Sequence, residues 1–181
     1  MKTQKSRIIV DLILIILGII FLVFGIKDLV DKINSTKIDD ATRFKSEYSY
    51  VSKENNYEYL TFKKFEEMIN SKTGVILLGS PLDPWTQVLV EPLNVVAKEE
   101  NTIIDYLDVN EYKNIIKKSK ILDNFDVPKI IFIKNGKINT IINKEDIYDK
   151  EFDDAPIEYW TDEKLEEFNS IIKSEVEKLV G

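Results

Sequence analysis

The stretch that most constrains the fold of this chain covers residues 74–87. An apolar run of strand length, residues 75–78, ends in a Gly-Ser-Pro turn. Asp83 then supplies a carboxylate that can cap a helix, and Pro84 suits the first helical position, where no N–H is needed. Apolar residues at helical spacing follow as far as Val96. The sequence therefore predicts a buried strand that leads through a sharp turn to a helix N-terminus, where unpaired N–H donors and positive dipole concentrate.

A second stretch with clear local signals covers residues 125–142. Val127-Pro128 precedes residues 129–134, whose apolar center at residues 130–133 is rich in Ile, and this segment has the length and composition of a buried strand. Asn135-Gly136 is the usual two-residue hairpin turn, and a second strand is expected after it at residues 137–142. This stretch predicts an antiparallel hairpin that begins at an X–Pro bond.

Together the two motifs resemble the thioredoxin-like superfamily. In that family the turn before the helix carries Cys-x-x-Cys, and the matching tetrapeptide here is Asp83-Pro84-Trp85-Thr86. The family's cis-proline strand matches Val127-Pro128-Lys129, where the family often has Thr at the last of these positions. The resemblance implies an α/β, thioredoxin-like fold, in which helices flank a central mixed sheet. It also implies a cis peptide bond between Val127 and Pro128.

The remaining elements fit the same order. A strand is expected at residues 57–60, a helix after Thr61, a strand at residues 102–107 and a helix from residue 108 to about residue 120. Apolar residues at helical spacing predict a C-terminal helix that begins near Thr161.

The N-terminal part of the chain has the pattern of a membrane anchor. Residues 8–26 are almost wholly apolar, and as a helix they would reach about 28 Å, close to the roughly 30 Å of bilayer hydrocarbon. Lys2, Lys5 and Arg7 precede this run, and the positive-inside rule then places the N-terminus in the cytoplasm. A cleaved signal peptide is the alternative, although the run exceeds the usual apolar length of such a peptide.

These patterns divide the chain into four expected parts. Residues 1–7 form a cytoplasmic tail, and residues 8–27 form a single transmembrane signal anchor in the lipid bilayer of the cell membrane. Residues 28–55 form a polar stalk, and residues 56–181 form the extracytoplasmic thioredoxin-like domain.

The composition removes several kinds of chemistry. The chain contains no Cys and no His, so thiol exchange, disulfides, Cys/His zinc sites and His-based acid–base catalysis have no residues to carry them. The family's buried proton-relay acid falls on Leu77 here, and Asp83 is interpreted as an anionic replacement for the thiolate. We therefore expect no redox activity, no catalytic residues, no cofactor and no metal. The net charge of −7 argues against a nucleic-acid partner.

The resemblance also implies where a partner would bind, because the helix-start turn and the cis-proline loop meet at one end of the sheet in this fold. The expected partner-binding residues are Asp83, Pro84, Trp85, Thr86, Val127, Pro128 and Lys129. The partner would be an unidentified protein or an extended peptide. Trp85 either covers the end of the core or faces solvent as a contact, and its place in the motif slightly favours the exposed contact. The acidic insertion at residues 143–159 is interpreted as a solvated loop.

The function expected from the sequence is that of a membrane-anchored, redox-inactive protein-binding or assembly module. The chain is weakly similar to thioredoxin-like accessory proteins of Gram-positive bacteria, some of which are associated with bacteriocin production. Two alternatives stay open. One is a non-redox enzyme that uses carboxylates including Asp83. The other is a structural subunit of a membrane complex.

Overall fold

The structure is a computed structural model, and it describes residues 39–113, 126–148 and 156–180. The predicted cytoplasmic tail, membrane anchor and first part of the stalk lie outside the described residues. Within the part of the chain that the structure describes, no helix has both the length and the apolar character needed to cross a bilayer.

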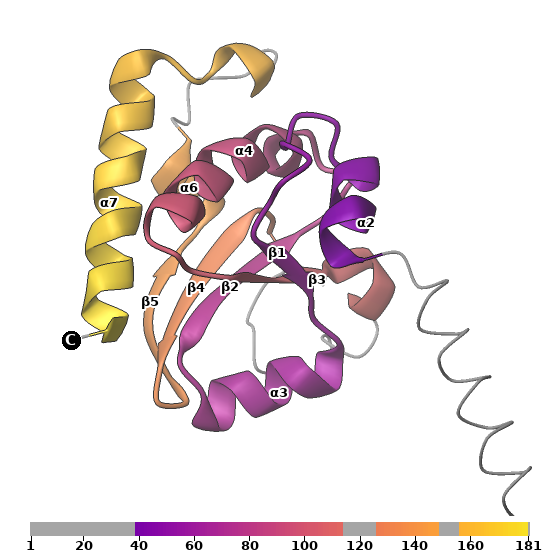
Figure 1. Cartoon of the computed structure of the whole chain (residues 1–181), viewed down its shortest axis with the longest axis vertical. Helices are drawn as coiled ribbons and strands as arrows, with labels where there is room; N and C mark the ends of the chain where they lie inside the picture. Colours follow the sequence, from indigo (N-terminus) through magenta and orange to yellow (C-terminus); the bar gives the residue numbers. More distant parts are fainter. Residues whose placement is uncertain (1–38, 114–125, 149–155, 181) are drawn as a thin grey trace, which may run out of the picture. The chain divides into compact units, whose positions relative to one another are not determined.

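Five strands form one mixed sheet in the order β1-β3-β2-β4-β5 (Figure 1). The strands β1 (Tyr57–Tyr59), β3 (Ile104–Asp108) and β2 (Gly74–Gly79) are parallel to one another. β4 (Lys129–Lys134) and β5 (Lys137–Ile142) continue the sheet as an antiparallel hairpin. This sheet and its helices are the arrangement that the resemblance implied.

Helices cover both faces of the sheet (Figure 1). α4 (Pro84–Glu99) and α7 (Asp162–Val180) pack on one face, and α3 (Phe62–Ser71) packs on the other, together with the helical residues 109–113. The Thr61 hydroxyl caps α3 by accepting a hydrogen bond from the Lys64 N–H, as the sequence indicates. Because α4 follows β2 directly, its N-terminus lies at the end of the central strand.

β2 is buried on both faces because its side chains alternate between two cores. Val75 and Leu77 pack under α4 and α7, whereas Ile76 and Leu78 pack against α3. None of the four is more than 2% exposed. This confirms the sequence prediction of a fully covered central strand.

A helix that the sequence did not predict, α2 (Asp40–Glu47), precedes β1 and belongs to the domain. Phe44 and Tyr48 are fully buried, and their rings stack with centroids 4.4 Å apart. The compact unit begins at Asp40, so residues 40–55, which the sequence analysis assigned to the polar stalk, are part of that unit. Phe44 lies in α2 and Tyr48 follows its last residue, so their four-residue spacing places both rings on one buried side.

The β4–β5 hairpin turns at Asn135-Gly136, as predicted. Both residues have positive φ, 53° and 73°, which the two-residue hairpin turn requires. Gly136 is needed for a second reason, because a Cβ there would lie 2.2 Å from the carbonyl carbon of Asn70. The Gly136 N–H also donates to the Lys72 carbonyl at 2.7 Å, so the turn is held against the end of α3.

Pro92 lies inside α4 and leaves one carbonyl of that helix without its usual partner. The carbonyl of Val88 would normally accept from the N–H four residues later, and Pro92 has none. The indole N–H of Trp160 donates to this carbonyl at 2.9 Å. The residues just before α7 therefore supply the hydrogen bond that the proline removes.

A double-mutant cycle can measure how much the Trp160 hydrogen bond to the Val88 carbonyl contributes when Pro92 is present and when it is replaced. Trp160→Phe should lower the free energy of unfolding by about 1–3 kcal/mol for the unsatisfied carbonyl, in addition to a packing loss. In a Pro92→Ala background the new N–H can bond Val88, so the same change should cost about 1 kcal/mol less. Urea unfolding of the four proteins measures the difference. An equal cost in both backgrounds would contradict the assignment.

Asp105 in β3 has a carboxyl group whose pKa is raised. Partial burial, and next the negative charge of Glu58 on the adjacent strand, raise the pKa of Asp105 from its usual 3.8 to about 6, although Lys64 and Lys72 oppose the rise. Between these two pH values the folded chain binds more protons than the unfolded chain. Stability should therefore fall as the pH rises from about 4 to about 6.

Asp105→Asn should remove this penalty. The stability of the variant minus that of the unchanged chain should be larger at pH 7 than at pH 4. Glu58→Gln should give a smaller increase of the same sign. Glu66→Gln, on the exposed side of α3, is the matched control and should show little pH dependence. Urea midpoints at the two pH values test this. If Asp105→Asn differs from the unchanged chain by the same amount at both pH values, the prediction of a raised pKa for Asp105 is wrong.

Candidate functional site

The turn between β2 and α4 is held by the side chain of Asp83. Its Oδ2 atom accepts hydrogen bonds from the Thr86 N–H at 2.7 Å and from the Thr86 hydroxyl at 2.6 Å. Asp83 is thus the N-cap that the sequence predicted, a contribution of about 1 kcal/mol in typical helices. The two residues that stand at the family's cysteine positions are joined here by hydrogen bonds.

The turn also depends on close packing beneath it. Gly79 ends β2, and a Cβ at that position would lie 2.6 Å from the Thr86 methyl group, so glycine is required by the close approach. The Gln87 side-chain amide donates to the Pro81 carbonyl at 2.8 Å and to the Glu47 carbonyl at 3.1 Å. The turn is therefore fixed from α4 and connected to the end of α2.

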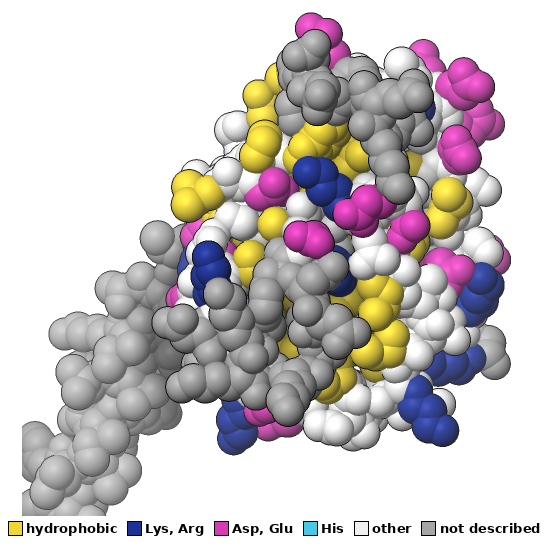
Figure 2. Space-filling model, turned by 180° about the vertical axis from the view of Figure 1, so that it is seen from behind, with side chains coloured by type: hydrophobic (Ala, Val, Ile, Leu, Met, Phe, Trp, Pro, Cys, Tyr) yellow, Lys and Arg dark blue, Asp and Glu magenta, His cyan; other side chains and the backbone are white. Residues whose placement is uncertain are grey.

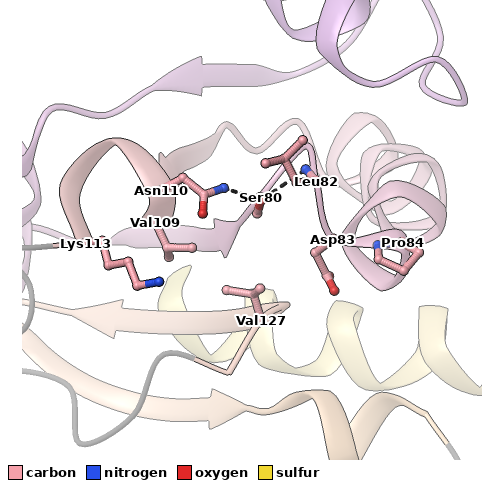
Figure 3. A pocket seen from close by; sticks show the side chains of 8 residues that line it. All are labelled: Ser80, Leu82, Asp83, Pro84, Val109, Asn110, Lys113 and Val127. Atoms are coloured by element: carbon pink, nitrogen blue, oxygen red, sulfur yellow. Dashed lines mark hydrogen bonds between the residues drawn. The ribbon is translucent and has the colours of Figure 1, made fainter.

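The peptide bond between Val127 and Pro128 is cis, which confirms the expectation from the resemblance. Val127 lies beside the β2–α4 turn, and Asp83, Pro84 and Val127 line one pocket of about 290 Å³ (Figure 3). The predicted meeting of the helix-start turn and the cis-proline loop is therefore present in the structure.

The same pocket contains residues that the sequence analysis did not single out. They are Ser80, Leu82, Val109, Asn110 and Lys113. The Ser80 hydroxyl accepts from the Leu82 N–H at 3.0 Å and from the Asn110 side-chain amide, which joins the turn to the helical residues after β3 (Figure 3). The sequence could have indicated these residues, because the two strands of a predicted strand–helix–strand unit are parallel and end at the same edge of the sheet. β2 and β3 are such a pair.

Leu82 is the main exposed apolar side chain of the turn. It is 84% exposed, although large aliphatic side chains are usually covered. Pro84, two residues later, is also exposed. By contrast, three of the predicted contact residues, Thr86, Pro128 and Lys129, are buried. Their side chains pack beneath the surface of the site and do not form that surface.

The sequence analysis favoured an exposed Trp85, but the structure differs. Its ring is partly buried and packs on Tyr148, with ring centroids 4.4 Å apart. The Tyr148 hydroxyl donates to the Trp85 carbonyl at 2.9 Å, and the Lys144 ammonium lies 4.9 Å from the center of the indole. Burial, and next the negative charge of Asp83, raise the pKa of Tyr148, which keeps this donor protonated.

The contacts of Trp85 come from the acidic insertion, whose described ends are not a solvated loop. α6 (Lys144–Ile147) and a short 3₁₀ helix (Pro156–Glu158) flank residues 149–155, which lie outside the described residues. Tyr148 and Tyr159 are buried, and their rings meet edge to face with centroids 4.7 Å apart. The density of aromatic residues at both ends of the acidic run was the available signal.

The charged groups of the pocket are few and of both signs. Asp83 and Lys113 stand on opposite walls (Figure 3). On the face of the molecule in Figure 2, acidic side chains gather in the upper half, and basic side chains lie more toward the lower margin. In the described part of the chain, no three acidic residues come together in a way that could hold a metal ion.

Comparisons with known proteins show no family for this chain. No family model matches the chain, and no curated protein matches it. Mitochondrial thioredoxin 3 from Saccharomyces cerevisiae is 18% identical with a TM-score of 0.39, over 53% of this chain and 85% of that one. Thioredoxin from Trypanosoma brucei brucei is 13% identical with a TM-score of 0.43, over 74% and 93%.

A further protein described as having a thioredoxin fold is 20% identical with a TM-score of 0.40, over 50% of this chain and 85% of that one. At these TM-scores the similarities carry no argument by themselves. The thioredoxin-like fold is assigned from the strand order, the β2–α4 turn and the cis peptide bond before β4. The chain is thus thioredoxin-like in fold and contains no cysteine.

The hydrogen-bonded pair at the family's cysteine positions predicts the outcome of restoring both sulfurs. Because the Asp83 and Thr86 side chains face each other, the double change Asp83→Cys and Thr86→Cys should allow an intramolecular disulfide under mild oxidation. Thiol titration before and after reduction measures it. Asp83→Cys alone is the control and should keep one titratable thiol. A double variant that keeps both thiols in oxidant would contradict the similarity of the turns.

Proposed function

We propose that this chain is a redox-inactive, thioredoxin-like module that binds a protein partner or an extended peptide at the pocket beside the cis-proline loop. The observation that carries the proposal is Leu82, an 84% exposed leucine at the rim of a pocket that the turn and the loop form together. Preformed hollows that combine apolar side chains with a few polar groups are typical of binding sites.

The main chain of Val127 supports the proposal. Among the described residues, no hydrogen bond engages its N–H or its carbonyl group, and β4 begins only two residues later. Free main-chain groups next to a strand can pair with an extended segment of a partner, as in strand addition. Such pairing does not require a thiol.

We also propose that the module is held at the extracytoplasmic face of the cell membrane. The support is the apolar run at residues 8–26 and the basic residues that precede it. An anchor would raise the local concentration of the pocket near membrane partners, so a weak contact would suffice.

Asp83 supports binding over non-redox catalysis. One oxygen of its carboxylate already accepts two hydrogen bonds from Thr86, and the cap explains why an acidic residue stands there.

Site-specific crosslinking tests the proposed surface. A photoreactive side chain in place of Leu82, in the full-length chain in its own cells, should give a discrete crosslinked partner. Val180 is the matched control, because it is an aliphatic residue with 87% exposure at the end of α7. Crosslinks from position 82 and none from position 180 are expected. Equal labelling from both positions, or a partner only from position 180, would refute the site.

A further inference from the structure

Lys113 brings an unmatched positive charge to the pocket. It is on the first helical turns after β3, and its ammonium group points toward the space between Val109 and Val127 (Figure 3). Lys63, Lys173 and Lys178 form ion pairs in the described part of the chain. Within that same part, Lys113 forms none.

Two acidic side chains at the strand ends beside the pocket have hydrogen-bond partners of their own. Asp83, on the opposite wall, caps α4 and accepts two hydrogen bonds from Thr86. Asp108, at the end of β3, accepts from the Asn110 N–H at 2.8 Å. Asp83 and Lys113 are the charged residues that line this pocket, and of the two only Lys113 has no hydrogen bond or ion pair among the described residues. The natural complement of its ammonium group is a carboxylate.

The Val127 side of the pocket indicates what kind of molecule carries this carboxylate. Val127 offers a main-chain N–H and carbonyl at the point where an antiparallel ladder begins, with Lys129 opposite Leu78. These groups suit the main chain of an extended peptide better than a small anion. Leu82 on the rim can then cover an apolar side chain of the same peptide.

We propose that the pocket selects an extended peptide segment that carries an acidic side chain, and that Lys113 is the residue that determines this selection. The inference rests on the proposed function and adds the chemistry of the partner. The carboxylate of the peptide pairs with the Lys113 ammonium, while the peptide main chain pairs with Val127. Because Lys113 is exposed, an ion pair with its ammonium corresponds to a preference of up to about fivefold over a neutral side chain.

A random heptapeptide display library, selected on the immobilised full-length chain, tests this without a known partner. Asp and Glu should be enriched about tenfold over Lys and Arg at one position of the selected peptides. Lys113→Gln should abolish the enrichment, and Lys113→Glu should invert it toward Lys and Arg. Lys137→Glu is the matched control, because it makes the same charge change on the exposed β4–β5 turn, and it should leave the preference unchanged. Circular dichroism confirms that each variant is folded.

Three outcomes would overturn the inference: no acidic preference in the unchanged chain, an acidic preference that survives Lys113→Glu, or no selected peptides at all. The crosslinking experiment at Leu82 decides the proposed function separately. A discrete partner crosslinked at position 82, together with no acidic preference in the library, would keep the proposed function and remove the role of Lys113.

Discussion

The site depends on the carboxylate of Asp83, which accepts both the main-chain N–H and the hydroxyl of Thr86. This pair of hydrogen bonds sets the first turn of α4 against the end of β2. An ionised acceptor at a helix N-terminus also gains from the helix dipole, so the local geometry does not need a covalent link. The chain thereby keeps the shape of a thioredoxin-like turn while it lacks any group that can exchange a disulfide.

Aromatic side chains from distant parts of the chain then hold α4 in place. Tyr148 donates to the Trp85 carbonyl in the first turn of the helix, and Trp160 donates to the Val88 carbonyl one turn later. Both contacts use the polar end of an otherwise apolar ring, which lets one residue fill the core and satisfy a buried carbonyl. The helix that carries the site is therefore fixed by donors from two distant parts of the chain.

The sequence predicted the features that local chemistry determines. The Asp83 cap, the Asn135-Gly136 turn and the buried strand β2 each depend on residues within a few positions of one another, and each is present. Only the family resemblance implied the cis bond at Pro128, since a proline alone leaves the cis form a minority.

What the sequence analysis missed depends on contacts across long stretches of chain. The Tyr148 donor lies 63 residues from the Trp85 carbonyl, and no local pattern shows that an acidic insertion returns to cover that indole. In α2 most residues are polar, so its weak apolar pattern hid Phe44, which only the finished core explains. Lys113 enters the pocket because β3 is parallel to β2, a relation of the sheet and not of the segment.

The absence of sulfur changes what the proposed contact can achieve. A thiol at the turn can form a mixed disulfide and so hold a partner covalently while other contacts are weak. Here the hold would come from Leu82, the Val127 main chain and the groups of one small pocket, so the complex would dissociate quickly if those contacts acted alone. With a membrane anchor at residues 8–27, the same weak contact would act at a raised local concentration. In the proposed function, the pocket would determine which partner binds. The anchor would account for most of the fraction of pockets that hold a partner.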